Sequence, residues 1–336
     1  MEEKHYDVVI IGGGPAGLTA GLFCGRAELR TLILEKESLG GQLLATELVD
    51  NYPGLPNITG AELAAKIESH ARDFGVETRR GAVAEIYNRG REKVVRTEDG
   101  QLFRAGAIIV CAGGSPKKLG AAGEAKFTGR GVSYCAVCDG PFFRNKVVAV
   151  VGSGDSAVGE ADYLTRFASK VYLITNRDRL DAVPLLVDRL SANPKVEFVW
   201  NTAVKEIGGN RAVEWIVTRD KHTGLEGRLD VAGVFIYVGF RPNSHIFPSG
   251  VMLDSGGYVV TGWDMETSQS GIYAAGDIRA QSTRQITNAI SDGTTAAIKA
   301  YEHLHRARLL KHPTLVVAHP TPIEAEQPPT PARKAS

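Results

Sequence analysis

Cysteine is scarce in this sequence, with four residues among 336, which is too few for a disulfide scaffold. Charge of one sign is missing as well, because 39 lysines and arginines balance 38 acidic residues and leave a formal net charge of +1. Such a balance gives no reason to expect nucleic acid or an anionic membrane surface as a partner. No apolar run approaches the roughly 20 residues that span a bilayer. We therefore expect a cytoplasmic protein in reducing surroundings, with no nucleic-acid or membrane partner.

Clustered metal ligands are also missing. A structural zinc site needs about four ligands, whereas Cys24 and Cys111 stand alone in apolar segments and no histidine lies at zinc-finger spacing. We predict no metal site, and we expect these two cysteines to be small core residues.

Glycine, by contrast, is abundant, with 38 residues, and two glycine-rich loops stand in the same local pattern. Residues 6–35 are predicted to form a strand, a glycine loop, a helix and a strand, at 6–11, 12–17, 18–26 and 30–34. Residues 146–175 repeat this plan at 146–151, 152–157, 158–168 and 170–174. The repeat predicts an α/β fold with two Rossmann-like units that bind FAD or NAD(P).

The order of the segments indicates that the second unit is inserted into the first. A further apolar strand at 107–110 leads to Ser115-Pro116, and the pattern breaks again at Arg241-Pro242-Asn243. A strand at 271–275 and a helix at 286–309 then complete the first unit. The predicted domains are 1–118 with 245–312, then 119–244, and a C-terminal tail at 313–336 that holds six of the 15 prolines.

The first loop carries the dinucleotide fingerprint Gly12-x-Gly14-x-x-Gly17. Gly12 permits a tight turn, Gly14 lets a pyrophosphate approach the backbone, and Gly17 lets the helix pack on the strand. Glu35 follows Gly14 by 21 residues, at the end of the second strand, where a carboxylate can hold a ribose diol. The alternative is a tight turn without a ligand, which the acid and the strand–loop–helix setting disfavour.

The two remaining cysteines, Cys135 and Cys138, lie between the glycine loops in the run Tyr134-Cys-Ala-Val-Cys-Asp-Gly140. They can close and reopen a disulfide, and the adjacent Asp139 can move the proton that this chemistry releases. A zinc site lacks further ligands, a structural disulfide does not suit reducing surroundings, and packing cysteines are not normally followed by Asp-Gly-Pro. We therefore predict a redox dithiol that relays electrons from a bound cofactor to another protein's disulfide.

The second loop, Gly152-x-Gly154-x-x-Ala157, lacks the acid that NAD binding favours. Thr175 stands where the carboxylate should be, 21 residues after Gly154. An NADP site needs several cations around the 2′-phosphate, and residues 175–181 offer two arginines that are offset by two aspartates. We expect weak nicotinamide binding or none, with the loop retained as a scaffold in the latter case.

These motifs make the chain resemble the low-molecular-weight, bacterial-type thioredoxin reductases over about residues 5–310. The motifs that carry the resemblance are the loop at 12–17, Gly40-Gly41-Gln42-Leu43, Asn51-Tyr52-Pro53-Gly54, the dithiol with Asp139, residues 271–277, and Arg284-Gln285. The resemblance implies a FAD domain with an inserted NADPH domain, assembly as a homodimer, and a thioredoxin-like protein as the partner. Cys138 would face the flavin, Cys135 would attack the partner's disulfide, and Asp139 would shuttle the proton.

The resemblance also implies which residues bind the cofactors. Glu35 would hold the adenosine ribose, and the Val83 backbone would lie beside the adenine. The residues assigned to FAD are Gly12, Gly14, Pro15, Ala16, Gly17, Glu35, Lys36, Gly40, Gly41, Gln42, Leu43, Asn51, Val83, Ala112, Gly113, Gly276, Asp277, Arg284, Gln285 and Ile286. Those assigned to a possible NAD(P) site are Gly152, Gly154, Asp155, Ser156, Ala157 and Arg177.

One departure from the family concerns the electron donor. The family's 2′-phosphate motif, His-Arg-Arg-x-x-x-Arg, falls on residues 175–181, where only Arg177 matches and Asn176 and Asp181 replace two of its arginines. Related reductases without the nicotinamide motifs take electrons from ferredoxin. The expected donor is therefore NADPH or, given the degraded motif, ferredoxin or another carrier. A flavin-bound redox sensor without efficient NADPH turnover is the alternative to a reductase.

Overall fold

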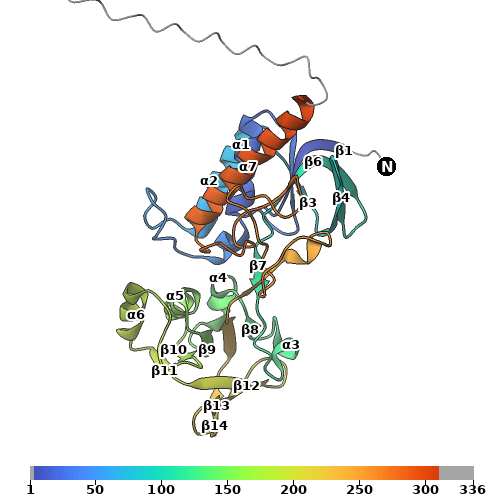
Figure 1. Ribbon diagram of the computed structural model, residues 1–336. Coiled ribbons are helices and arrows are strands. Elements are labelled where there is room, and N and C mark those ends of the chain that lie inside the picture. Colours follow the sequence, from blue (N-terminus) through green and yellow to red (C-terminus); the bar gives the residue numbers. More distant parts are fainter. Residues whose placement is uncertain (1–3, 310–336) are drawn as a thin grey trace, which may run out of the picture.

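A seven-stranded sheet forms the centre of the first of two units in the computed structural model, which describes residues 4–309 (Figure 1). Its strands are β1 (Lys4–Ile11), β2 (Thr31–Glu35), β3 (Glu77–Arg80), β4 (Val83–Arg89), β5 (Glu92–Thr97), β6 (Leu102–Val110) and β17 (Ile272–Ala274). They lie in the order β3-β2-β1-β6-β5-β4, and β17 also pairs with β6. Because β3, β2, β1, β6 and β17 are parallel, this part has the arrangement of a dinucleotide-binding sheet.

Three helices cover one face of this sheet: α1 (Pro15–Arg26), α2 (Gly60–Asp73) and α7 (Ile286–Leu309) (Figure 1). The residues of β1 alternate between two cores, since Val8 and Ile10 pack with residues of α1 and α7, whereas Val9 and Ile11 pack on the opposite face. Burial on both faces explains why the second half of β1, Val8–Ile11, is continuously apolar. Two short helical turns, η1 (Gly41–Ala45) and η3 (Ser244–Ile246), also belong to this unit.

The second unit has a parallel sheet of its own, in the order β11-β10-β9-β15-β8. Its strands are β8 (Val132–Ser133), β9 (Val147–Gly152), β10 (Lys170–Ile174), β11 (Val196–Val199) and β15 (Gly233–Tyr237). An antiparallel sheet of β12 (Thr202–Gly208), β13 (Trp215–Asp220) and β14 (Glu226–Asp230) lies beside it. The helices are α3 (Glu124–Phe127), α4 (Ala136–Asp139), α5 (Asp155–Leu164) and α6 (Pro184–Ser191), with η2 (Gly140–Phe143) after α4.

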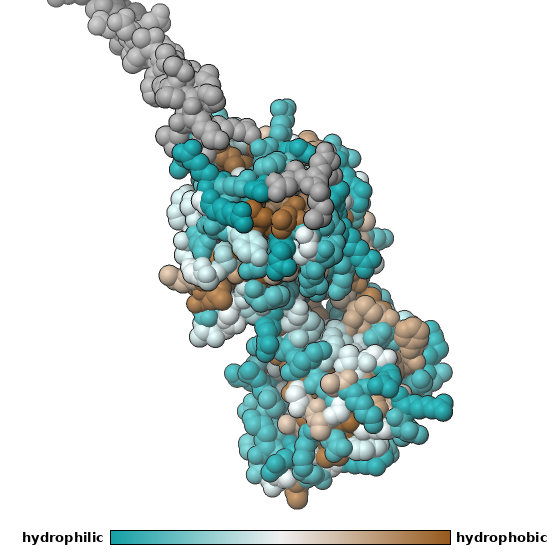
Figure 2. Space-filling view, turned by 90° about the vertical axis from the view of Figure 1, so that its right-hand side faces the viewer, coloured by the Kyte–Doolittle hydropathy of each residue, from teal (hydrophilic) through white to brown (hydrophobic). Residues whose placement is uncertain are grey.

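The chain passes between the units along a two-stranded ribbon of β7 (Gly114–Pro116) and β16 (Phe240–Pro242) (Figure 1). Asn243 fixes one end of this ribbon, because its amide donates to the Ala112 carbonyl (2.7 Å) and its Oδ1 accepts from the Ser115 hydroxyl (2.8 Å). In the space-filling view the units form two lobes that meet at a narrower waist (Figure 2). The two predicted breaks in the pattern therefore lie side by side at the crossing.

The predicted α/β fold with two Rossmann-like units is confirmed, and α7 and β10 have the predicted bounds. The helix predicted at 158–168 is wrong at its end. It stops at Leu164, because the Thr165 hydroxyl bonds back to the Asp162 carbonyl (2.6 Å) and a turn follows. Cys24 and Cys111 are buried core residues, as predicted. The predicted tail at 313–336 lies outside the described residues.

Within residues 4–309, no helix has the length and apolar character needed to cross a bilayer. Over the same residues, no three side chains of histidine, cysteine, aspartate or glutamate are grouped so that they could hold a metal ion.

Candidate active site

Cys135 and Cys138 form a disulfide at the single helical turn α4, which follows β8. Cys135 has extended backbone angles and caps this turn. The N–H of Cys138 donates to the Sγ of Cys135 at 3.1 Å. After reduction, the same N–H would stabilise a thiolate on Cys135, which is the nucleophilic form of the side chain.

Hydrogen bonds from the second sheet hold this turn in place. The N–H of Ala136 donates to the hydroxyl of Tyr237 in β15 at 2.8 Å. The Ser133 hydroxyl accepts from the Cys135 N–H (3.0 Å) and donates to the Cys135 carbonyl (3.1 Å). Ala136 is fully buried, whereas Cys138 is exposed. The disulfide is therefore accessible, on a backbone that the sheet fixes.

The dithiol turn lies at the end of the second unit that faces the first (Figure 1). There α4 approaches η1, the turn that contains the predicted residues Gly41, Gln42 and Leu43. Near it, Arg166 forms an ion pair with Glu47, which follows η1. The predicted dithiol and one of the predicted cofactor segments thus meet at the junction of the two units.

Close contacts explain two glycines of the first loop. Gly12 has φ +101°, and a Cβ there would overlap the carbonyl oxygen of Cys111. A Cβ on Gly17 would overlap the carbonyl oxygen of Gly12, so only glycine lets α1 pack this tightly. Gly14 is different, because the nearest atom to its Cβ would be the Gly41 Cα at 3.9 Å. The space over Gly14 remains open at the start of α1.

The predicted ribose-binding carboxylate is held at the edge of this loop. Glu35 ends β2, and its Oε2 accepts from the N–H of Gly13 at 2.7 Å, while its Oε1 accepts from that of Glu37 at 3.0 Å. The Glu35 carbonyl accepts from the N–H of Gly81 (2.8 Å), two residues before Val83 begins β4. The residues predicted for ribose and adenine are therefore neighbours.

Other predicted segments converge on the same loop from distant parts of the chain. The N–H of Gly40 donates to the Gly13 carbonyl at 2.8 Å. Gly276, after β17, lies so close to Ala16 that a Cβ on the glycine would be 3.0 Å from the Ala16 Cβ. The fold thus brings residues 40–43 and 276 to the start of α1.

A second set of contacts joins four further predicted positions. The Asn51 amide donates to Gln285 Oε1 at 3.2 Å. A Cβ on Gly113 would lie 3.8 Å from Gln42 Nε2. Residues from four separate segments therefore surround one region of the first unit.

Asp277 is mostly buried in this region. Burial raises the pKa of its carboxyl, and the guanidinium of Arg284 opposes that shift. A neighbouring buried ion pair, between Arg279 and Asp292 at 2.7 Å, has no counterpart in any sequence motif. Because Asp292 also accepts from the N–H of Gly276 (3.1 Å), this pair holds the segment after β17 against α7.

The second loop borders a cavity of about 450 Å³ in the second unit. Gly152 has φ +155°, and a Cβ there would overlap the carbonyl oxygen of Tyr237. A Cβ on Gly154, at the start of α5, would have no atom within 4 Å. The lining includes all the positions predicted for NAD(P), namely Gly152, Gly154, Asp155, Ser156, Ala157 and Arg177.

The arginine predicted for a possible NAD(P) site, Arg177, is paired with an aspartate. Arg177 Nη1 lies 2.8 Å from Asp181 Oδ2, and the N–H of Asp181 donates to the Ser153 carbonyl at 2.8 Å. The segment after β10 thereby folds back onto the second loop and brings a carboxylate to the cation. Thr175 is buried, and its hydroxyl accepts from the Arg177 N–H (3.3 Å).

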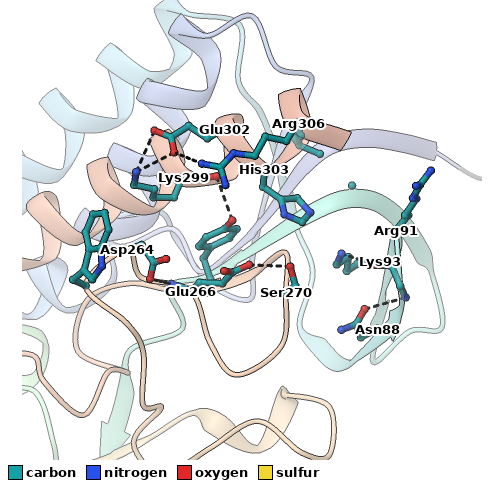
Figure 3. Close-up of a pocket in the computed structure, with 15 residues that line it drawn as sticks. Asn88, Arg91, Lys93, Asp264, Glu266, Ser270, Lys299, Glu302, His303 and Arg306 are labelled. Carbon is teal, nitrogen blue, oxygen red and sulfur yellow. Dashed lines mark hydrogen bonds and ion pairs between the residues drawn. The ribbon is translucent and has the colours of Figure 1, made fainter. Parts of the chain in front are cut away.

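A larger cavity, of about 750 Å³, lies in the first unit among residues of α7, the β4–β5 hairpin and the 263–273 segment (Figure 3). Several of its charged side chains have partners within the cavity lining. Glu302 contacts Lys299 (3.0 Å) and Arg306 (3.6 Å), and the Lys93 ammonium donates to the Gly90 carbonyl (2.7 Å). No residue predicted for the dithiol or the cofactors lines this cavity, so it is not the candidate redox site.

Comparison with known proteins assigns this geometry to a family. Residues 6–293 match the family described as pyridine nucleotide-disulphide oxidoreductase. The thioredoxin reductase of Bacillus subtilis (strain 168) is 48% identical over 297 residues, which cover 88% of this chain and 94% of that relative. The chain belongs to the low-molecular-weight thioredoxin reductase family.

Two solved structures are also similar to this reductase. The thioredoxin reductase of Lactococcus lactis, in the FR conformation, is 41% identical with a TM-score of 0.87, over 90% of this chain and 99% of that one. A ferredoxin-flavin thioredoxin reductase from Clostridium acetobutylicum is 31% identical with a TM-score of 0.51, over 91% and 100%. The predicted enzyme class, a flavoprotein disulfide oxidoreductase, is confirmed.

Alanine at two positions of the first loop should separate folding from cofactor binding. In Gly17→Ala the new Cβ overlaps the Gly12 carbonyl, so the free energy of unfolding should fall by about 1–3 kcal/mol or more. In Gly14→Ala the loss should stay within about 1 kcal/mol, while the methyl group occupies the approach to the backbone and lowers the flavin content. Urea unfolding of flavin-free protein and the flavin-to-protein ratio measure the two effects. Equal destabilisation by both substitutions would contradict the separate roles assigned to Gly14 and Gly17.

Proposed function

We propose that this reductase uses FAD to reduce a disulfide of a thioredoxin-like protein through Cys135 and Cys138. The observation that carries the proposal is the position of their disulfide, on an accessible turn of the second unit that approaches η1 of the first. A dithiol there can be charged from a cofactor in the first unit and discharged to a disulfide outside. The similar proteins of B. subtilis and L. lactis are named thioredoxin reductases, which supports the class of partner.

The residues of the first loop fit FAD. Open space over Gly14 at the start of α1 suits a pyrophosphate, and the Glu35 carboxylate stands where a ribose diol is held. When bound, FAD supplies the two electrons that the reaction consumes. We assign it the residues predicted from the sequence, from the loop at 12–17 to the segment at 276–286.

The dithiol then acts by thiol–disulfide exchange. The Cys135 thiolate attacks one sulfur of the partner's disulfide, which forms a mixed disulfide and releases the partner's other sulfur as a thiolate. Cys138 attacks the Cys135 sulfur, which releases the reduced partner and restores the Cys135–Cys138 disulfide. Two electrons pass from the dithiol to the partner. Asp139 takes the proton from the attacking thiol and returns it to the leaving sulfur.

We further propose the domain division predicted from the sequence. The FAD domain is 1–118 with 245–312 and the NAD(P)-type domain is 119–244, which agrees with the chain crossing at β7 and β16. A homodimer follows from the family, and large apolar side chains exposed on the helical layer of the first unit, Ile298 and Tyr301 among them, suit a subunit interface. The cytoplasmic location stays a prediction from the cysteine usage.

Two electron donors fit this enzyme. The cavity at the second loop supports a nicotinamide cofactor, and NADPH is the family's own donor. The Arg177–Asp181 pair opposes NADPH, because the carboxylate neutralises the arginine that would meet the 2′-phosphate. A similar protein is named a ferredoxin-flavin thioredoxin reductase, which supports ferredoxin or another carrier as the replacement.

A flavin-bound redox sensor is the second candidate, and the same neutralised arginine favours it, because a sensor needs no efficient NADPH turnover. In a sensor, the state of the dithiol would control a protein contact. Repeated turnover of a disulfide substrate by catalytic amounts of the protein would exclude it.

Serine at either redox cysteine should abolish turnover. Cys135→Ser and Cys138→Ser should each lower the rate of thioredoxin-like disulfide reduction by roughly 10³-fold or more, since neither can complete the exchange. Flavin content should be unchanged. Cys24→Ala is the matched control, because that buried thiol lies outside the redox pair, and it should keep its turnover. Turnover that survives in either serine variant would remove the dithiol from the mechanism.

Charge reversal at the phosphate position should restore NADPH use. Asn176→Arg with Asp181→Arg frees Arg177 and adds two cations, so the KM for NADPH should fall by about tenfold or more while that for NADH changes little. Asp178→Arg is the control, since it reverses an exposed charge at a position that the motif leaves free. An equal gain in that control would show a general charge effect instead of a clamp.

Anaerobic mixing identifies the donor of the unmodified enzyme. Reduced ferredoxin should bleach the flavin faster than NADPH if the paired arginine weakens nicotinamide binding as proposed. Prompt bleaching by NADPH at low concentration would contradict the weakened clamp.

A further inference from the structure

A buried carboxyl at the junction of the two units has no part in the mechanism above. Glu160 lies on α5, and its Oε2 is buried without a hydrogen-bond partner among residues 4–309. An ionised carboxylate in that position is costly, because nothing replaces its lost hydration. Burial and, secondarily, the Glu47 carboxylate raise the pKa of Glu160 to about 8, so the side chain carries a proton at neutral pH.

Groups from both units face this carboxyl. Glu47 approaches it from the first unit, after η1, and Tyr163 lies one turn further along α5. Tyr237 of β15 faces it as well: burial and then the Glu160 carboxylate raise the pKa of that phenol, and Asp139 of α4 acts in the same direction. The strands β9 and β10 and the helix α6 add apolar side chains beneath α5.

One side of α5 and the turn that follows it face Glu47 of the first unit. Glu160, Tyr163 and Arg166 are spaced by three residues, which places them on one side of the helix and its end. Arg166 pairs with Glu47 and lies over the Tyr163 ring, 5.4 Å from its centre. This side of α5 is also joined to the dithiol turn, since a Cβ on Gly140 would lie 3.5 Å from the Tyr163 ring.

We propose that Glu160 is a positioning residue of this reductase, whose proton lets α5 rest against Glu47 and whose ionisation drives α5 away from the first unit. When the proton leaves, Glu160 and Glu47 are both carboxylates at the junction, where Arg166 pairs with Glu47. Because Tyr237 of β15 holds the Ala136 N–H and α4 packs against α5, the dithiol turn moves with the second unit. The state of one side chain thus biases whether Cys135 and Cys138 face η1. The movement of α5 does not depend on the proposed function, whereas its effect on turnover does.

The direction of the pH dependence follows from the two environments of Glu160. Burial at the junction and, secondarily, Glu47 raise its pKa to about 8, and we assign the ordinary value of 4.5 to the separated, hydrated state. The arrangement in which α5 rests against Glu47 therefore binds the proton more tightly and is fully favoured below pH 4.5. Its population relative to the separated state should fall by up to tenfold per pH unit as the pH rises to about 8, and then level off.

Spin labels on the two units test this inference in the oxidised, flavin-loaded enzyme. Ser69→Cys on α2 and Ser191→Cys on α6 are exposed positions, whereas Cys24 and Cys111 are buried and the dithiol is closed. Double electron–electron resonance, a pulsed electron paramagnetic resonance method, gives the distribution of distances between the labels. The short-distance population should decline between about pH 5 and pH 8, and turnover should follow the same profile.

Neutral substitutions decide whether Glu160 is responsible. Glu160→Gln keeps the size and removes the charge, so its distance distribution should not change with pH. Glu47→Gln removes the opposing carboxylate and should give a smaller pH response. Asp162→Asn is the control on the same helix, two residues along and thus on another side, and it should respond like the unmodified enzyme.

A distribution that does not change with pH in the unmodified chain, or an unaltered response in Glu160→Gln, would overturn the proposal. The label measurement needs no substrate, so it remains decisive even if the chain fails to reduce a thioredoxin. Failure of the proposed function shows instead as absent turnover with every donor.

Discussion

The hydrogen bond from the Ala136 N–H to the Tyr237 hydroxyl is the contact on which the arrangement of the site depends. It fixes α4 to β15, so the positions of the two sulfurs are set by the second sheet. The loop at 12–17 and the segments around it belong to the first sheet. Both crossings of the chain lie in the β7–β16 ribbon, and each unit has hydrophobic cores of its own. The proposed relay between cofactor and outside partner would use this ribbon as a hinge.

Three pairs of charged side chains in this structure have different effects. The Arg177–Asp181 pair is exposed and contributes at most about 1 kcal/mol to stability. Under the donor proposal its functional effect is larger, because Asp181 would neutralise the cation that a 2′-phosphate would meet. The buried Arg279–Asp292 pair instead holds the Gly276 segment in place. Glu160 and Glu47 form the third case, two acids brought together at a movable junction.

The local parts of the structure could be predicted from the sequence. The glycine spacing indicated the positions of both strand–loop–helix units, and the helix predicted at about 286–309 agrees with α7. The two-residue spacing of Cys135 and Cys138 indicated their disulfide. The end of α5 was predicted four residues too late, because the hydroxyl of Thr165 turns the chain in a way that apolar periodicity does not show.

Short spacing along the chain encodes the two glycine loops and the vicinal dithiol of this protein. The groups that support these motifs come together only on folding. Tyr237 and Ala136 are 101 residues apart, and Asn243 and Ala112 are 131 apart, so no local pattern connects them. Glu160 looks like any helical acid in the sequence. Burial and, secondarily, Glu47 of the other unit set its environment, and burial of a charge depends on the three-dimensional surroundings alone.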